Sequence, residues 1–170
     1  ALKAARTTTS VGKVFATEYR RITGRDIDPN SLYFEGSVAT AREHAEGVLR
    51  GLERFPDIPL ERVVAFGTEN EYASATSRAI RFNQVWTSPA DRKKYLDALA
   101  QDEASRWHVP GSGNPVAVAL HEFGHVVDTS SDVFKRDLDA LLARSAAARD
   151  ADLATARAAG EMVDADDFAA

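Results

Sequence analysis

The sequence predicts an α+β protein with a small, mostly antiparallel sheet, a helix that carries two histidines and a long C-terminal helix. Three observations support this fold class. Apolar residues recur at helical spacing between positions 40 and 52 and again after position 115. Residues 63 to 66 and 72 to 86 are rich in β-branched and aromatic side chains, which favours strands. With 170 residues, the chain is long enough to bury a substantial core.

Two parts are expected along the chain. Residues 1 to 36 are predicted to form an N-terminal lead-in and a helix, with the helix covering about positions 11 to 23. Residues 37 to 170 are predicted to form a single compact unit, because 170 residues with 44% apolar content suit one compact domain. The candidate site described below belongs to this second part.

The first helix of the second part is expected to begin at position 40. Thr40 and Glu43 have the spacing of a capping box, in which each side chain bonds the backbone near the other. Pro56 is expected to end this helix. His44 lies on its flank and is predicted to be at the surface or only partly packed.

Strands and further helices are expected after it. Residues 63 to 66 and 72 to 86 are predicted to form two or three strands of one sheet. A helix is expected over about 88 to 106, because its start has a serine cap, an early proline and an aspartate. Glycine and proline then interrupt the pattern, and two more helices are predicted over about 115 to 128 and 132 to 159.

Composition excludes several classes of function. The formal net charge is -5, with 21 basic residues dispersed among 26 acidic ones, so we expect no nucleic-acid partner. No apolar stretch approaches the roughly 20 residues of a membrane span, so the protein is expected to be soluble. The absence of cysteine removes thiolate metal sites and a cysteine nucleophile. Secretion or association with a phage particle stays open.

The most specific motif is His121-Glu122-Phe123-Gly124-His125, which has the pattern H-E-x-x-H. At about 100° per residue, His125 lies about 40° and Glu122 about 100° from His121 around the helix. The three polar side chains therefore share one arc, while an apolar face that includes Phe123 and Leu120 points away from it. Two imidazoles one turn apart can bind a single zinc ion. An accidental match on an amphipathic helix is the alternative interpretation.

The glutamate indicates hydrolysis as well as metal binding. A carboxylate beside a water molecule that zinc activates can accept its proton and pass it to a leaving amine. We therefore predict that Glu122 is the general base and acid, and that Zn²⁺ is the cofactor.

Hydrolytic zinc sites usually have three protein ligands, so a further His, Asp or Glu is needed. Asp128 faces the same side of the helix but lies about 10 Å along its axis from His121. It is better suited to a hydrogen bond with an imidazole. The third ligand is therefore expected farther along the chain, where Glu161 and a group of aspartates lie. An exposed acidic tail is the alternative interpretation of that segment.

The motif and the end of the chain together resemble one family. His121 to Asp128, followed after a long predicted helix by Gly160 to Ala169, is similar to the catalytic domain of the anthrax lethal factor family of zincin metallopeptidases. The resemblance covers roughly residues 113 to 170. It implies a zincin-like fold, a peptide bond as substrate, and a third zinc ligand just before a Phe-Ala pair. That position is Asp166 here, with Glu161 as the alternative.

Three differences separate this chain from the family pattern. The third ligand would be an aspartate where the family has a glutamate. The tyrosine that helps to stabilise the oxyanion is replaced by Ala159, and Ala170 stands where the family has another glutamate. Tyr72 or His108 is the candidate for the missing donor, and His108 is also a candidate to line the site.

The resemblance also implies how a substrate binds. Zincins hold an extended protein or peptide substrate against the edge strand of a small sheet beside the metal helix. Residues 79 to 86 are the candidate for that strand, with an interior strand as the alternative. Three other functions stay open: an inactive zincin-like structural or binding module of a phage or toxin protein, a peptidoglycan amide hydrolase, and a helical interaction protein without metal.

Overall fold

The computed structural model describes residues 1 to 65, 71 to 106 and 109 to 130, together with the single positions 143, 144, 147, 151 and 155. The chain divides into two compact units, residues 1 to 130 and 131 to 170. The first unit contains the histidine motif. In the second, the single described positions are helical, and the Thr155 hydroxyl donates to the Ala151 carbonyl at 2.9 Å. The rest of the helix expected over 132 to 159 lies outside the described residues.

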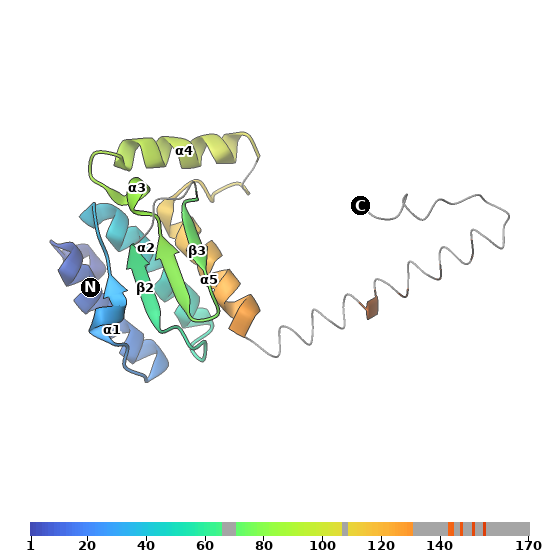
Figure 1. Ribbon diagram of the computed structural model, residues 1–170, viewed down its shortest axis with the longest axis horizontal. Coiled ribbons are helices and arrows are strands. Elements are labelled where there is room, and N and C mark those ends of the chain that lie inside the picture. Colours follow the sequence, from blue (N-terminus) through green and yellow to red (C-terminus); the bar gives the residue numbers. More distant parts are fainter. Residues whose placement is uncertain are drawn as a thin grey trace. The chain divides into compact units, whose positions relative to one another are not determined.

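The first unit has an α+β architecture, which confirms the predicted class (Figure 1). In chain order its elements are η1 (Leu2–Ala4), α1 (Thr8–Thr23), η2 (Pro29–Ser31), β1 (Leu32–Tyr33), α2 (Val38–Arg54), β2 (Arg62–Ala65), β3 (Ala73–Ala75), β4 (Ala79–Phe82), α3 (Gln84–Thr87), α4 (Arg92–Ala104) and α5 (Pro115–Ser130).

The sheet is mixed, with strand order β1-β2-β4-β3. Strand β2 pairs in parallel with both β1 and β4, and of the three described strand pairs only β3 and β4 are antiparallel. The prediction of a mostly antiparallel sheet is therefore wrong. The physical reason is connectivity: helix α2 carries the chain from β1 back to the start of β2, whereas a tight turn joins β3 to β4.

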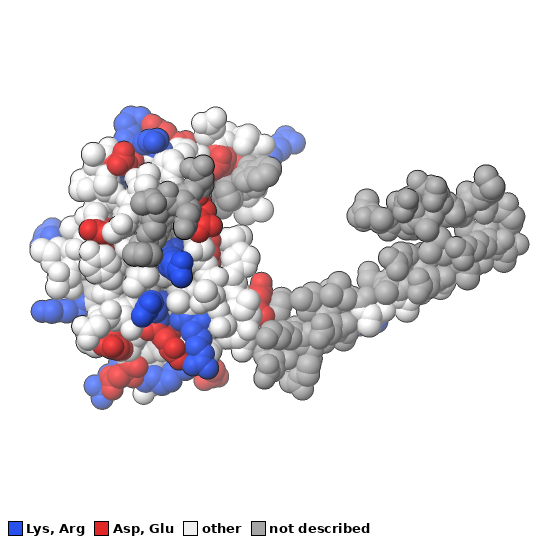
Figure 2. Space-filling view, in the orientation of Figure 1, with Lys and Arg blue, Asp and Glu red and all other residues white. Residues whose placement is uncertain are grey.

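The helices α1, α2 and α5 lie on one side of this sheet (Figure 1). Strand side chains alternate accordingly: Ile80 and Phe82 are buried, whereas Arg81 between them is exposed. On the face in view, basic and acidic side chains are interspersed (Figure 2). Within the described residues, no helix is long and apolar enough to cross a membrane.

Helices α2 and α5 pack unusually closely because α2 has glycine where α5 crosses it. A Cβ atom on Gly47 would lie 2.3 Å from the Val116 carbonyl oxygen, and one on Gly51 would lie 2.3 Å from the Phe123 ring. Phe123 is 1% exposed, so α5 is fixed against the core by a buried aromatic ring. This contact determines which face of α5 remains outside.

The start of α2 differs from the predicted capping box. The N-cap is Ser37, whose hydroxyl accepts from the Thr40 amide. The Thr40 hydroxyl instead accepts from Arg92 at 2.7 Å, and Glu43 makes a two-bond ion pair with the same guanidinium at 2.8 and 3.0 Å. Both residues of the predicted capping box are thus hydrogen-bonded to Arg92, which lies far along the sequence.

Three further predictions about local structure are wrong. Helix α4 begins at Arg92, with Asp91 at the N-cap position and no side-chain capping bond. The Ser88 hydroxyl donates to the Asp91 carboxylate and accepts from the Asp91 amide, so it holds the turn before the helix. Residues 84 to 86, predicted as strand, belong to the short helix α3 (Gln84–Thr87) because Asn83 caps it through a bond from the Val85 amide. His44 is 2% exposed and stacks on Phe82 inside the core.

Candidate metal and hydrolase site

Helix α5 presents the H-E-x-x-H motif. Asn114 supports its first turn, since its side-chain oxygen accepts from the Ala117 amide at 3.0 Å. The side chains of α5 that pack into the core are Val118, Ala119, Phe123, Val126 and Val127. Leu120, which was predicted on this apolar face, is 44% exposed, so its assignment is corrected. The opposite side of the helix carries His121 and His125, both exposed.

The two histidine rings converge. Their Nε2 atoms are 3.1 Å apart, and the rings are nearly perpendicular, with an interplanar angle of 89°. For an ion about 2.0 to 2.1 Å from both nitrogens, the angle nitrogen–ion–nitrogen would be roughly 100°, close to the tetrahedral angle that zinc prefers. The same distance also permits a hydrogen bond between two neutral imidazoles. The pair therefore fits the zinc-ligand role predicted for His121 and His125.

Glu122 lies beside the pair but is buried. Its exposure is 7%, and no hydrogen bond to its carboxylate occurs among the described residues. Burial raises the pKa of this carboxyl to about 6; the charge of His125 lowers the pKa, and the carboxylate of Glu71 raises it. A carboxylate that is desolvated in this way is a stronger proton acceptor than one in water.

Strand β3 forms the edge of the sheet beside α5. Residues 79 to 86, the predicted edge strand, instead provide the interior strand β4 and helix α3. The residues that lead into β3 are held by Asn83, whose side chain donates to the Glu71 carbonyl at 2.8 Å and whose amide donates to the Tyr72 carbonyl at 3.0 Å.

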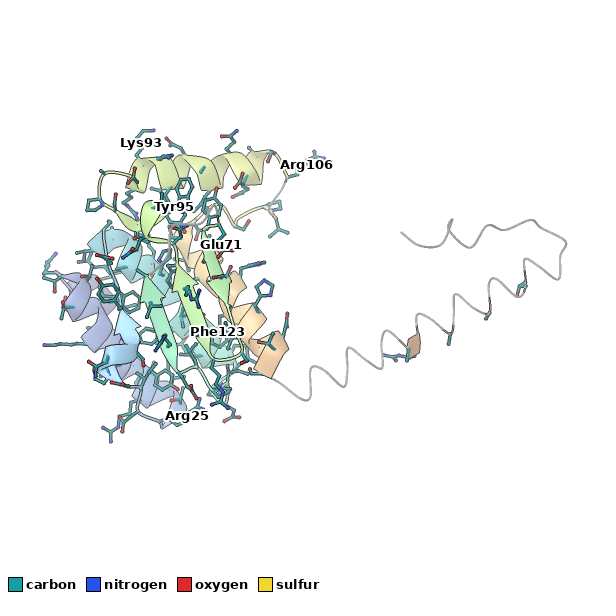
Figure 3. All side chains as sticks on the ribbon, viewed as in Figure 1. Arg25, Glu71, Lys93, Tyr95, Arg106 and Phe123 are labelled. Carbon is teal, nitrogen blue, oxygen red and sulfur yellow. The ribbon has the colours of Figure 1, made fainter. Side chains whose placement is uncertain are left out.

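Glu71 is a charged residue near the site that sequence reasoning did not identify. Its side chain is exposed and its charge acts on Glu122. Figure 3 labels Glu71 and Tyr95 in the region between α4 and the sheet. The turn-like run that contains Glu71 gave no signal of this position, because the neighbourhood arises from the pairing of β3 with β4.

Tyr72, a candidate oxyanion donor, has its hydroxyl engaged elsewhere. It donates to the Asp102 carboxylate at 2.7 Å, and burial together with this bond raises its pKa. The ring packs against Trp86 and Tyr95, with centroids 5.3 and 5.6 Å away. In this arrangement Tyr72 joins β3 to α4.

Of the other predicted site residues, the structure describes Asp128 alone. Asp128 is exposed on α5. His108 and Asp166, as well as the alternative ligand Glu161, lie outside the described residues. Among the residues that are described, no group of three or more potential ligands surrounds a common point. The third-ligand assignment stays a prediction.

No family model matches the sequence, no curated protein matches it, and no solved structure matches the fold.

Proposed function

We propose that this chain is a zinc-dependent metallopeptidase that hydrolyses peptide bonds in a protein or peptide substrate. His121 and His125 would hold the metal, and Asp166 would be the third ligand. The observation that carries the proposal is the 3.1 Å approach of two imidazole nitrogens beside a buried carboxylate to which no described residue hydrogen-bonds. The resemblance of the motif to the lethal factor family of zincins supports the same function.

Glu122 would act as the general base and then the general acid. A bound zinc ion would supply Lewis acidity and lower the pKa of a water molecule. The Glu122 carboxylate would accept the proton of the attacking water and later deliver it to the amine that leaves. Its burial favours this role because the ionised carboxylate is poorly solvated, and this desolvation makes proton uptake more favourable.

The substrate would lie along β3. Among the strands that the structure describes, β3 pairs with β4 alone, so its outer edge carries backbone groups that an extended peptide can pair with. It also packs against α5, which places a bound peptide near the histidine pair. Backbone pairing holds many sequences in one register, so we expect broad recognition of extended segments.

The test is Glu122→Gln in the full, zinc-loaded chain, assayed with a library of internally quenched peptides that includes a peptidoglycan cross-link. We expect kcat/KM to fall by about 10² to 10⁴-fold, the usual contribution of acid-base catalysis, while zinc content is unchanged. Glu53→Gln is the matched control, because Glu53 is exposed and pairs with Arg21. Undiminished cleavage by Glu122→Gln would refute the mechanism, and cleavage of the cross-link alone would favour the peptidoglycan alternative.

A second candidate is a zincin-like module that binds zinc without turnover, as part of a phage or toxin protein. The engagement of the Tyr72 hydroxyl by Asp102 favours it, because this candidate oxyanion donor is occupied. This function predicts one zinc ion per chain and no cleavage of any library member by the wild-type protein.

A further inference from the structure

We propose that Asp102 and Glu103 form a clamp that holds the entry to strand β3 and the start of helix α5 in a fixed relative position. The two carboxylates are adjacent at the end of α4, yet they bind different elements. The clamp is a property of the first unit by itself. That it positions a peptide substrate rests on the proposed function, in which the peptide lies on β3 beside the α5 histidines.

Asp102 binds the β3 side. Its carboxylate accepts the Tyr72 hydroxyl at 2.7 Å, and Tyr72 immediately precedes the strand. The Tyr72 ring packs on Trp86 and Tyr95, and its carbonyl accepts the Asn83 amide. Because ring, hydroxyl and backbone are all held, a bond to the hydroxyl fixes the entry to the strand.

Glu103 binds the α5 side. One carboxylate oxygen accepts the Gly111 amide at 2.7 Å, and the other accepts the Gly113 amide at 2.6 Å. Hydrogen bonds to an ionised acceptor are roughly twice as strong as neutral ones, and these two lower the pKa of Glu103. The loop they bind ends at Pro115, the first residue of α5.

The glycine at position 113 fits the clamp, and the one at position 111 fits the local backbone. Gly111 has a φ of 86°, which favours glycine. A Cβ on Gly113 would lie 2.5 Å from a Glu103 carboxylate oxygen and 3.1 Å from the Leu99 carbonyl. A Cβ at position 113 would therefore displace the Glu103 carboxylate from its bond with the Gly113 amide. The break in helical pattern before α5 is thus a binding loop for one side chain of α4.

A distance measurement tests the clamp without metal or substrate. The chain has no cysteine, so Ser74→Cys on β3 and Leu120→Cys on α5 provide two unique spin-label sites in the full chain. Electron double resonance should give one narrow distance distribution in the labelled parent. Asp102→Asn, Glu103→Gln and their combination should broaden it. Asp97→Asn is the matched control, since the Asp97 carboxylate pairs with Lys93 on the same helix.

A binding measurement tests the consequence for the site. Two ligands are compared. Acetohydroxamate contacts only the zinc ion, whereas a tripeptide hydroxamate also pairs with the edge of β3. In the zinc-loaded clamp variants, the tripeptide compound should lose about tenfold or more in affinity, because small displacements of a binding surface have large effects. The affinity for acetohydroxamate and the zinc content should stay unchanged. A general loss of folding would lower both.

The outcomes separate the two proposals. If neither hydroxamate binds the wild-type protein, the proposed function fails, while the spin-label distances still decide the clamp. If the distribution stays narrow in both single variants, the clamp is overturned. The clamp is also overturned if Asp97→Asn broadens the distribution equally, or if both hydroxamates weaken together. Should the double variant fail to fold, the single variants decide.

Discussion

His44 is enclosed within the first unit. Its ring stacks on Phe82 with centroids 3.8 Å apart, and its Nε2 atom lies 3.1 Å from the Tyr95 hydroxyl. Burial, with a smaller contribution from the charge of Arg92, lowers the pKa of His44 to about 3. The ring therefore stays neutral in the folded protein throughout the range in which an exposed histidine takes up a proton.

The pH dependence of stability follows from this pKa. Above the ordinary histidine pKa of 6.5, both the folded and unfolded states hold a neutral ring. As pH falls from 6.5 toward 3, only the unfolded state binds the proton, so His44 reduces the free energy of unfolding. The slope approaches about 1.4 kcal/mol per pH unit.

Urea denaturation between pH 7 and 4.5 measures this effect against His44→Gln. Glutamine can keep a hydrogen bond to Tyr95 but does not titrate. We expect the stability difference between the wild type and the variant to shift against the wild type as pH falls. A difference that is independent of pH would show that the folded state protonates His44 as easily as the unfolded one.

At the scale of elements, the contact between α2 and α5 controls how the histidine helix is seated. Gly47→Ala would place a Cβ atom 2.3 Å from a backbone oxygen of α5 and 2.7 Å from the Ala119 side chain. The helices would have to separate, and overpacking of this kind costs about 1 to 3 kcal/mol. We expect a lower urea midpoint for this variant.

Gly12→Ala is the matched control for that substitution. Gly12 also lies inside a helix, α1, but the nearest atom to a new Cβ would be 3.8 Å away, an ordinary contact. Alanine should therefore stabilise the protein by about 0.5 to 1 kcal/mol through helix propensity alone. Equal effects of the two substitutions would show that close helix packing is not what requires Gly47.

Elements also differ in how far local sequence determines them. Helix α5 follows from its own residues, because the periodic apolar face and the polar arc are contained within the helix. The start of α2 does not, because Arg92 engages Thr40 and Glu43 from another helix. Likewise, the β-branched and aromatic residues of β4 predict a strand, but they do not determine whether it is an edge strand or an interior strand.

At the scale of the molecule, the first unit should fold alone. The buried hydrophobic residues that the structure describes form clusters between Ala5 and Val127, within residues 1 to 130. We expect a fragment of residues 1 to 130 to unfold cooperatively in urea. Loss of a residue that only hydrogen-bonds a metal ligand costs about 10 to 100-fold in metal affinity. The fragment lacks Asp166, the proposed third ligand, so its zinc affinity should fall below that of the full chain by more than this.

Single substitutions in the full chain complete this test. Asp166→Ala should reproduce the affinity of the fragment in a zinc competition titration, and Glu161→Ala should not. The reverse result would assign the third ligand to Glu161. Equal affinity of the fragment and the full chain would place the third ligand within the first unit.

Residue types and spacings over a few turns were enough to establish the α+β class and a helix with His121, Glu122 and His125 on one arc. Only the tertiary structure decided four other features. They are the strand directions, the edge position of β3, the burial of His44, and the binding of Asp102 and Glu103 to separate elements. These features depend on contacts between residues far apart in the sequence, whose partners local propensity does not specify. The two imidazoles that meet at 3.1 Å belong to the first category, since one helical turn is enough to bring them together.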